Sequence, residues 1–217
     1  MTINIPTDYS DVTISQLMKW EKAVEENNEL LLDFQLISIF CNIPLTETIK
    51  IPQDQFTEVV DMISRIQDNQ QTFKRQFTLN GVDYGFIPNL DEMTTGEYID
   101  IGTYFDADPL RLMAVLYRPI KQKHKDLYSI EKYKGTEETY KLMAHAPSSE
   151  LLGAKVFFWS LATELLKHIP IYLQRNLSKE QEMLLERNGV GTLQLMQSLE
   201  VITSNMKPFT NLKFSNF

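Results

Sequence analysis

Histidines and paired carboxylates perform much of the chemistry in proteins, and this chain spaces them poorly for such work. Its three histidines, His124, His145 and His168, are scattered, and none lies three or four residues from another. No His-Glu-x-x-His pattern occurs, and no carboxylate–histidine pair has the spacing of metal ligands. We therefore expect solvated or hydrogen-bonded imidazoles near helix ends and no metal site.

The nucleophile and nucleotide motifs give the same answer. Cys41, the one cysteine, ends an apolar segment without a base nearby, so we expect a buried small side chain there. No G-x-S-x-G, P-loop or G-x-G-x-x-G pattern occurs, and Gly189-Val190-Gly191 offers two of the needed glycines after a helix rather than a strand. The sequence predicts no catalytic residue and no cofactor, which favours a protein that is not an enzyme.

Composition indicates an ordinary globular chain. Of 217 residues 43 % are hydrophobic, and 21 basic against 29 acidic side chains give a net charge of −8. This balance disfavours nucleic acid and anionic lipid as partners. A single cysteine excludes an internal disulfide framework and fits a reducing compartment. Without a secretion-type leader or an 18-residue apolar run, the sequence predicts a cytoplasmic protein rather than a membrane protein.

Charge is distributed unevenly along the chain. Residues 83–108 contain seven acidic and no basic side chains, whereas residues 111–134 contain seven basic and two acidic ones. Two interpretations are open. The two runs form complementary patches that align copies of the protein, or a partner, head to tail. Alternatively, the acids cap helices and the basic loop is solvated, which is the interpretation we favour.

Hydrophobic spacing predicts helices in the first 70 residues. Thr13 is a suitable N-cap for a helix that ends near Asn27-Asn28, and residues 29–41 form an apolar segment typical of a buried helix. Pro52 opens an amphipathic helix to about residue 66. After residue 70 the spacing of apolar residues changes from that of a helix to that of strands. Residues 73–79 and 82–87 read as two strands joined by Asn80-Gly81, the strongest short signal for a hairpin.

The second half is expected to be helical. Helices should begin near Thr94 and at Asp108-Pro109, the second ending at Arg118-Pro119 before a loop, residues 119–134, with a short strand near 127–130. A helix over 136–145 and an apolar helix over 150–169 follow, the latter kinked or ended by Pro170. Two more are expected over 179–187 and 192–204. The apolar helix should supply the core, through Leu152, Val156, Phe157, Trp159, Leu161 and Leu165.

These elements predict a mainly α fold: a single globular helical domain with one small β-hairpin. The domain should span residues 1–217, with a possible subdivision into N-terminal helices, 1–70, and a hairpin plus helical core, 71–217.

Several short motifs carry a family resemblance. They are the Asn-Gly turn, Thr94 to Asp100 (T-x-G-E-Y-I-D), Tyr117-Arg118-Pro119 and Gly153-Ala154-x3-Phe157-Phe158. With the stretch Phe77 to Glu131 they resemble poorly characterised proteins of tailed bacteriophages, and more distantly the tail and baseplate-hub assembly chaperones of those phages. Such chaperones are small, acidic and largely helical, bind another phage protein and have no catalytic residues.

The resemblance implies a non-enzymatic assembly protein, a tail assembly chaperone in the host bacterial cytoplasm, with a tail or baseplate protein as partner. The alternatives are a permanent virion subunit, such as an adaptor, and a small phage enzyme or host-directed regulator. Homo-oligomers are compatible with all three.

Two segments are candidates for the partner contact. The hairpin, residues 73–87, can add a strand to a partner's sheet. The aromatic tail, residues 206–217, offers anchors for a pocket, or folds back over the protein's own core. The expected contact residues are Asn80, Gly81, Tyr84, Phe86, Phe209, Phe214 and Phe217.

Overall fold

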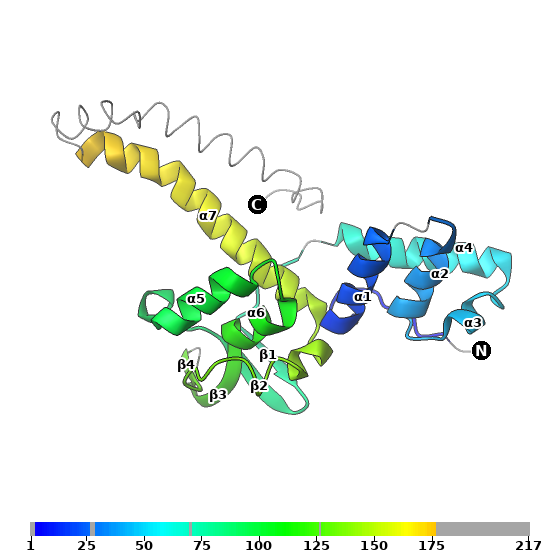
Figure 1. Cartoon of the computed structure of the whole chain (residues 1–217), viewed down its shortest axis with the longest axis horizontal. Helices are drawn as coiled ribbons and strands as arrows, with labels where there is room; N and C mark the ends of the chain where they lie inside the picture. The colour runs from blue at the N-terminus through cyan, green and yellow to red at the C-terminus, as the bar shows by residue number, and fades with distance from the viewer. Residues whose placement is uncertain (1–2, 27–28, 70, 126, 177–217) are drawn as a thin grey trace. The chain divides into compact units, whose positions relative to one another are not determined.

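A computed structural model describes residues 3–26, 29–69, 71–125 and 127–176. The α-helices are α1 (Ile14–Glu25), α2 (Glu29–Phe40), α3 (Leu45–Thr48), α4 (Gln53–Ser64), α5 (Thr95–Tyr104), α6 (Pro109–Leu116) and α7 (Ser148–Asn176). Short 3₁₀ turns are η1 (Arg65–Asp68), η2 (Leu90–Glu92) and η3 (Leu142–His145). The strands are β1 (Gln76–Leu79), β2 (Val82–Phe86), β3 (Tyr117–His124) and β4 (Leu127–Ile130) (Figure 1).

The chain divides into two compact units, residues 1–154 and 155–217, with the boundary inside α7. The four strands, α1 to α6 and the first turns of α7 belong to the first unit. The prediction of one domain over residues 1–217, with its subdivision near residue 70, stays a prediction.

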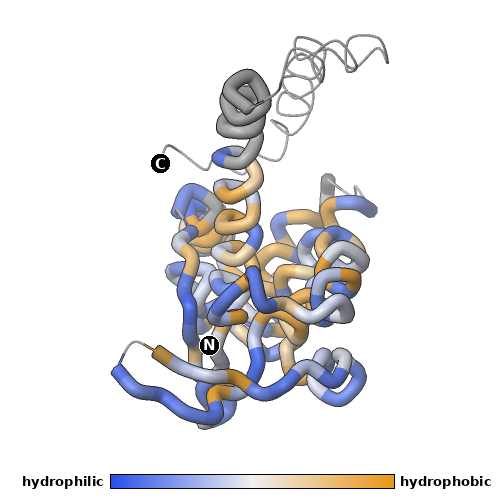
Figure 2. Tube along the Cα trace, turned by 90° about the vertical axis from the view of Figure 1, so that its left-hand side faces the viewer, coloured by the Kyte–Doolittle hydropathy of each residue, from blue (hydrophilic) through white to orange (hydrophobic). Residues whose placement is uncertain are grey.

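The expected mainly α fold with one small hairpin is wrong. The four strands form one antiparallel sheet in the order β1-β2-β3-β4, so the chain is an α+β protein. The error came from β3, which begins directly where α6 ends. Pro119 correctly signalled the end of the helix, but the residues after it are mostly charged and show no alternation of apolar side chains. Figure 2 shows this distal part of β3 as hydrophilic.

The cap signals located the helix starts correctly. Thr13 caps α1 and forms a reciprocal capping box with Gln16. Thr94 does the same for α5 with Glu97, and Asp108 caps α6, whose first residue is Pro109. These motifs satisfy backbone N–H groups locally, so they are readable without knowledge of the tertiary structure.

The Asn80-Gly81 hairpin is confirmed. Both residues have positive φ, 51° and 78°, and the flanking pairs run from Leu79–Val82 to Gln76–Gly85. This is the backbone that a two-residue turn requires between strands of right-handed twist. The second hairpin, β3–β4, turns after Lys125, also at positive φ, and its register shifts between Ile120 and Gln122.

The core lies around α6 rather than α7, so the predicted centre is wrong. Five consecutive α6 residues, 112–116, are buried, and Tyr117 and Met143 beside them are 1 % and 0 % exposed. Along α7, Val156 is buried, but Leu161 is 38 % exposed and the other described candidates, Leu152, Phe157 and Trp159, are half-buried. The side chain of Leu165 lies outside the described residues.

The expected helix over 136–145 is also wrong, because these residues form turns that end in η3. Of the two alternatives for Pro170, ending the helix is excluded, since α7 continues to Asn176. The helices expected over 179–187 and 192–204 lie outside the described residues.

Candidate functional site

The structure places the predicted contact residues of the hairpin in two different environments. Asn80 and Gly81 are exposed at the turn, whereas Tyr84 and Phe86 are 5 % and 3 % exposed and point into the core. The tail residues Phe209, Phe214 and Phe217 lie outside the described residues. In the described chain, the accessible parts of the hairpin are its turn and its edge.

An aromatic cluster holds the inner face of the hairpin. Phe77 stacks on Tyr84 with ring centroids 5.5 Å apart, and Tyr117 meets Phe77 and Phe86 edge-on at 5.1 and 5.3 Å. The Tyr117 hydroxyl donates a hydrogen bond of 2.7 Å to the carbonyl of Lys74. Burial raises the pKa of this phenol, so it remains a neutral donor. The cluster fixes β1 and β2 against the start of β3.

The backbone edge of β1 is directed away from the sheet. In a two-residue hairpin, the pairs Leu79–Val82 and Phe77–Tyr84 exchange hydrogen bonds, and the bond from Phe86 N–H to the Arg75 carbonyl, 2.8 Å, continues this pattern. The N–H and C=O groups of Gln76 and Thr78 therefore point outward. Within the described residues, β1 pairs with β2 alone. Neither proline, bulge nor lysine, the usual protections of an edge strand, occurs in β1.

Side chains from the second hairpin pack on the outer face of β1–β2. The Lys123 ammonium donates to Gln76 Oε1 at 2.6 Å, and the Tyr128 hydroxyl donates to the Phe86 carbonyl at 2.8 Å. The Tyr128 ring occupies the space where a side chain of residue 85 would lie. Gly85 is therefore required by this close approach. These contacts join the two hairpins.

A buried ion pair links α5 to β3. Arg118 donates to Glu97 Oε1, and the two side chains are 11 % and 5 % exposed. The other Glu97 oxygen accepts from the Thr94 backbone and hydroxyl, both at 2.7 Å. The Arg118 guanidinium also lies 5.5 Å from the Tyr133 ring centroid, and Tyr133 donates to Asp100. These contacts join α5, β3 and the segment after β4.

The pKa of Glu97 reflects this environment. Burial raises the pKa of the carboxyl. The hydrogen bonds from Thr94 and the charge of Arg118 lower the pKa by more than burial raises it, so the net shift is downward. Glu97 is thus ionised in the folded protein at neutral pH. Its role is to neutralise Arg118 and cap α5, which requires no bound ligand.

Arg111 forms a second, more exposed cluster on α6. Its guanidinium pairs with Glu137 at 2.6 Å and with Asp108 at 3.3 Å, and it lies 4.3 Å from the Tyr140 ring centroid. Arg118 thus pairs with an acid earlier in the sequence, and Arg111 pairs with one earlier and one later acid. Asp108 and Glu97 also take part in the N-terminal caps of α6 and α5, as the helix-capping interpretation expected. The ion pairs Asp108–Arg111 and Glu97–Arg118, which neither interpretation predicted, partly neutralise the two charged runs.

The remaining reactive side chains are placed as follows. His124 and His145 are exposed, and the side chain of His168 is not described. Burial raises the pKa of the Cys41 thiol to about 11, which keeps it protonated at neutral pH. Among the described side chains, no group of three or more His, Cys, Asp or Glu is arranged to hold a metal ion.

Comparison with protein-family models finds no match, and comparisons with curated proteins and with solved structures find none either. Over the part of the chain that the structure describes, no helix is both long and apolar enough to cross a membrane.

The Glu97–Arg118 pair is the feature that sequence reasoning missed. Glu97 lies in the Thr94 to Asp100 motif and in the acidic run, and Arg118 lies in the Tyr117-Arg118-Pro119 motif and in the basic run. The signal was therefore present, but 21 residues separate the partners, and their pairing depends on how α5 meets β3.

Proposed function

We propose that this chain is a non-enzymatic bacteriophage assembly protein that binds a tail or baseplate component, as a tail assembly chaperone does. The observation that supports a binding role most strongly is the edge of β1, with the backbone groups of Gln76 and Thr78 directed outward. An extended partner segment adds to such an edge through main-chain hydrogen bonds.

The motifs behind the resemblance have structural roles, in keeping with a binding protein. Glu97 and Arg118 form the buried pair, and Thr94 caps α5. A Cβ on Gly153 would lie 2.5 Å from the Thr72 carbonyl oxygen, so glycine allows α7 to approach the segment before β1. In this proposal these residues keep the sheet edge in place.

The edge can be blocked without breaking the hairpin. Thr78→Pro removes an outward N–H, whereas Thr78→Val keeps it, and both variants lose the 2.6 Å bond from the Thr78 hydroxyl to Asp83. We expect Thr78→Val to retain capture of the tail or baseplate component from phage-infected cells, and Thr78→Pro to reduce it at least about tenfold. The measurement is quantitative mass spectrometry of proteins that co-purify with each variant.

Thermal melting of the two variants provides the control, because a folded Thr78→Pro protein must be compared with a folded Thr78→Val protein. Equal capture by both folded variants would mean that β1 is not the binding edge.

Purified virions distinguish the proposal from a permanent virion subunit. A chaperone leaves before the particle matures, so we expect mass spectrometry of purified particles to lack this chain. A fixed copy number per particle would establish the structural alternative instead.

A further inference from the structure

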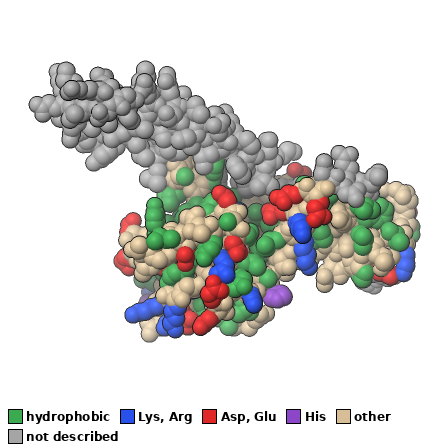
Figure 3. All heavy atoms as spheres, viewed as in Figure 1, with side chains coloured by type: hydrophobic (Ala, Val, Ile, Leu, Met, Phe, Trp, Pro, Cys, Tyr) green, Lys and Arg blue, Asp and Glu red, His purple; other side chains and the backbone are tan. Residues whose placement is uncertain are grey.

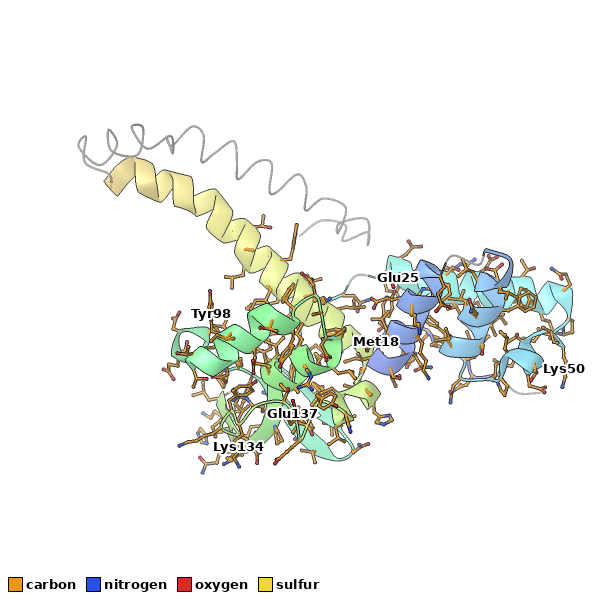
Figure 4. The ribbon with its side chains drawn as sticks, in the orientation of Figure 1. Met18, Glu25, Lys50, Tyr98, Lys134 and Glu137 are labelled. Carbon is orange, nitrogen blue, oxygen red and sulfur yellow. The ribbon has the colours of Figure 1, made fainter. Side chains whose placement is uncertain are left out.

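The helix α5 has an uncharged face that is exposed along its whole length. Thr95, Tyr98, Ile99, Gly102 and Thr103 follow the spacing of one helix side, and each is exposed. Tyr98 and Ile99 are 71 % and 56 % exposed, and Figure 4 shows Tyr98 projecting from α5. Amphipathic helices normally bury such a stripe. Here the buried side of α5 instead carries Glu97, which pairs with Arg118.

Acidic side chains lie at both ends of α5. Asp91 and Glu92 precede α5 in η2, and Asp106 follows its last turn. All three are exposed, and none forms an ion pair within the described residues. A partner that covers Tyr98 and Ile99 should therefore present an apolar side chain between basic ones.

The tip of the β3–β4 hairpin presents this combination. Leu127 is 77 % exposed, more than any other large apolar side chain in the described chain. Lys121 and Lys125 nearby are exposed and without an ion pair among the described residues, and residues 121–127 (KQKHKDL) carry a net charge of +2. Figure 3 shows acidic side chains at one end of α5 and basic ones over the β3–β4 hairpin, at separate places.

We propose that a second copy of this chain is the occupant: the β3–β4 tip of one copy binds the exposed face of α5 in another, Leu127 contacting Tyr98 and Ile99. The lysines of the tip then lie near the acids at the ends of α5. In this proposal the complementary-patch interpretation applies only to the charged side chains that form no ion pair within their own chain. This inference concerns self-association alone and does not rest on the proposed function.

The contact is small, so the self-association should be weak, and it should weaken with salt because exposed charges contribute to it. We expect analytical ultracentrifugation of the purified chain to show association that grows with protein concentration and falls when the salt is raised from 50 to 500 mM. Over this range the Debye screening length shortens from about 14 to about 4 Å. A chain that stays monomeric at the highest soluble concentration and low salt overturns the proposal.

Single-site variants test the two faces separately. Leu127→Ser and Ile99→Ser should each weaken association at least about tenfold. Ile49→Ser is the matched control, because Ile49 is 66 % exposed on a different part of the first unit and should leave association unchanged. Each replaced side chain is exposed, so folding should survive, and circular dichroism checks this. Equal effects of all three variants, or no effect of the first two, contradict the proposal.

Cysteine cross-linking between different copies identifies the contact directly. A mixture of Tyr98→Cys and Leu127→Cys chains should form a mixed disulfide at least about tenfold faster than Tyr98→Cys mixed with Ile49→Cys. The buried Cys41 does not interfere, since its raised thiol pKa keeps it unreactive. Fast self-cross-linking of Tyr98→Cys alone would show that α5 meets α5, and would overturn the arrangement proposed here.

Discussion

Replacing Glu97 by glutamine is expected to lower the free energy of unfolding by about 3–5 kcal/mol. The variant keeps the size of the side chain and an oxygen that accepts from Thr94, but it leaves the buried Arg118 charge without its partner. Chemical denaturation of the two proteins measures the loss. Asp91→Asn, which removes an exposed acid near the same helix, is the control and should change stability by less than about 0.5 kcal/mol.

The pair itself is tested by a double replacement. Glu97→Gln with Arg118→Met should be less destabilised than the sum of the two single variants, because the second change removes the charge that the first one strands. Strict additivity, or a Glu97→Gln effect below about 1 kcal/mol, would show that the two side chains do not depend on each other.

Acid should act on the same pair. The pKa of Glu97 in the folded protein lies below its ordinary value of 4.5, so this carboxylate contributes stability above that pH. The contribution is lost as the pH falls below about 4.5 and through the lowered folded pKa. The stability difference between the wild type and Glu97→Gln should therefore shrink from pH 6 toward pH 3.

Replacing Tyr117 by alanine should cost about 3–5 kcal/mol of stability. The side chain is 1 % exposed and contacts both Phe77 and Phe86, so its removal leaves a cavity where β1, β2 and β3 meet. Tyr117→Phe preserves the ring and removes the hydrogen bond to the Lys74 carbonyl, for an expected loss of about 1–3 kcal/mol.

Chemical denaturation of both Tyr117 variants separates packing from hydrogen bonding. Equal losses would mean that the hydroxyl, not the ring, accounts for the stability of this junction. A small loss in Tyr117→Ala would show that the core does not centre here.

Local signals in the sequence predicted the elements that depend on local chemistry. The caps at Thr13 and Asp108 accept hydrogen bonds from backbone N–H groups of the next few residues, and Asn80-Gly81 adopts the positive φ of a tight turn. These effects are local, so they do not depend on the rest of the fold. The strand β3 could not be recognised in this way. Its pairing with β2 and β4 comes from tertiary structure, and its solvated lysines conceal the period of a strand.

The core was misplaced for a related reason. The stretch after Ser148 is longer and apolar over more of its length. However, α6 contacts α5, η3 and β3, and its last five residues, 112–116, are all buried. Apolar content alone does not reveal how many neighbours a helix has.

The hairpin was correctly placed as an element, but its contact residues were only partly foreseeable. Tyr84 and Phe86 are aromatic residues of β2, and aromatic residues suit both interfaces and cores. In the sequence they alternate with Asp83 and Gly85, but which face of the sheet the core covers was not visible there. The accessible feature, the backbone edge of β1, follows from sheet order, which no side-chain pattern reports.

Residue-resolved amide hydrogen exchange tests most directly the claim that β1 is an open edge for a partner. In the free protein, the N–H groups of Gln76 and Thr78 should exchange quickly, while those of Phe77 and Leu79 are protected by their bonds to β2. In the complex with the captured tail or baseplate protein, the Gln76 and Thr78 amides should become protected as well. Slow exchange of these two amides in the free protein, or unchanged fast exchange in the complex, would contradict the account.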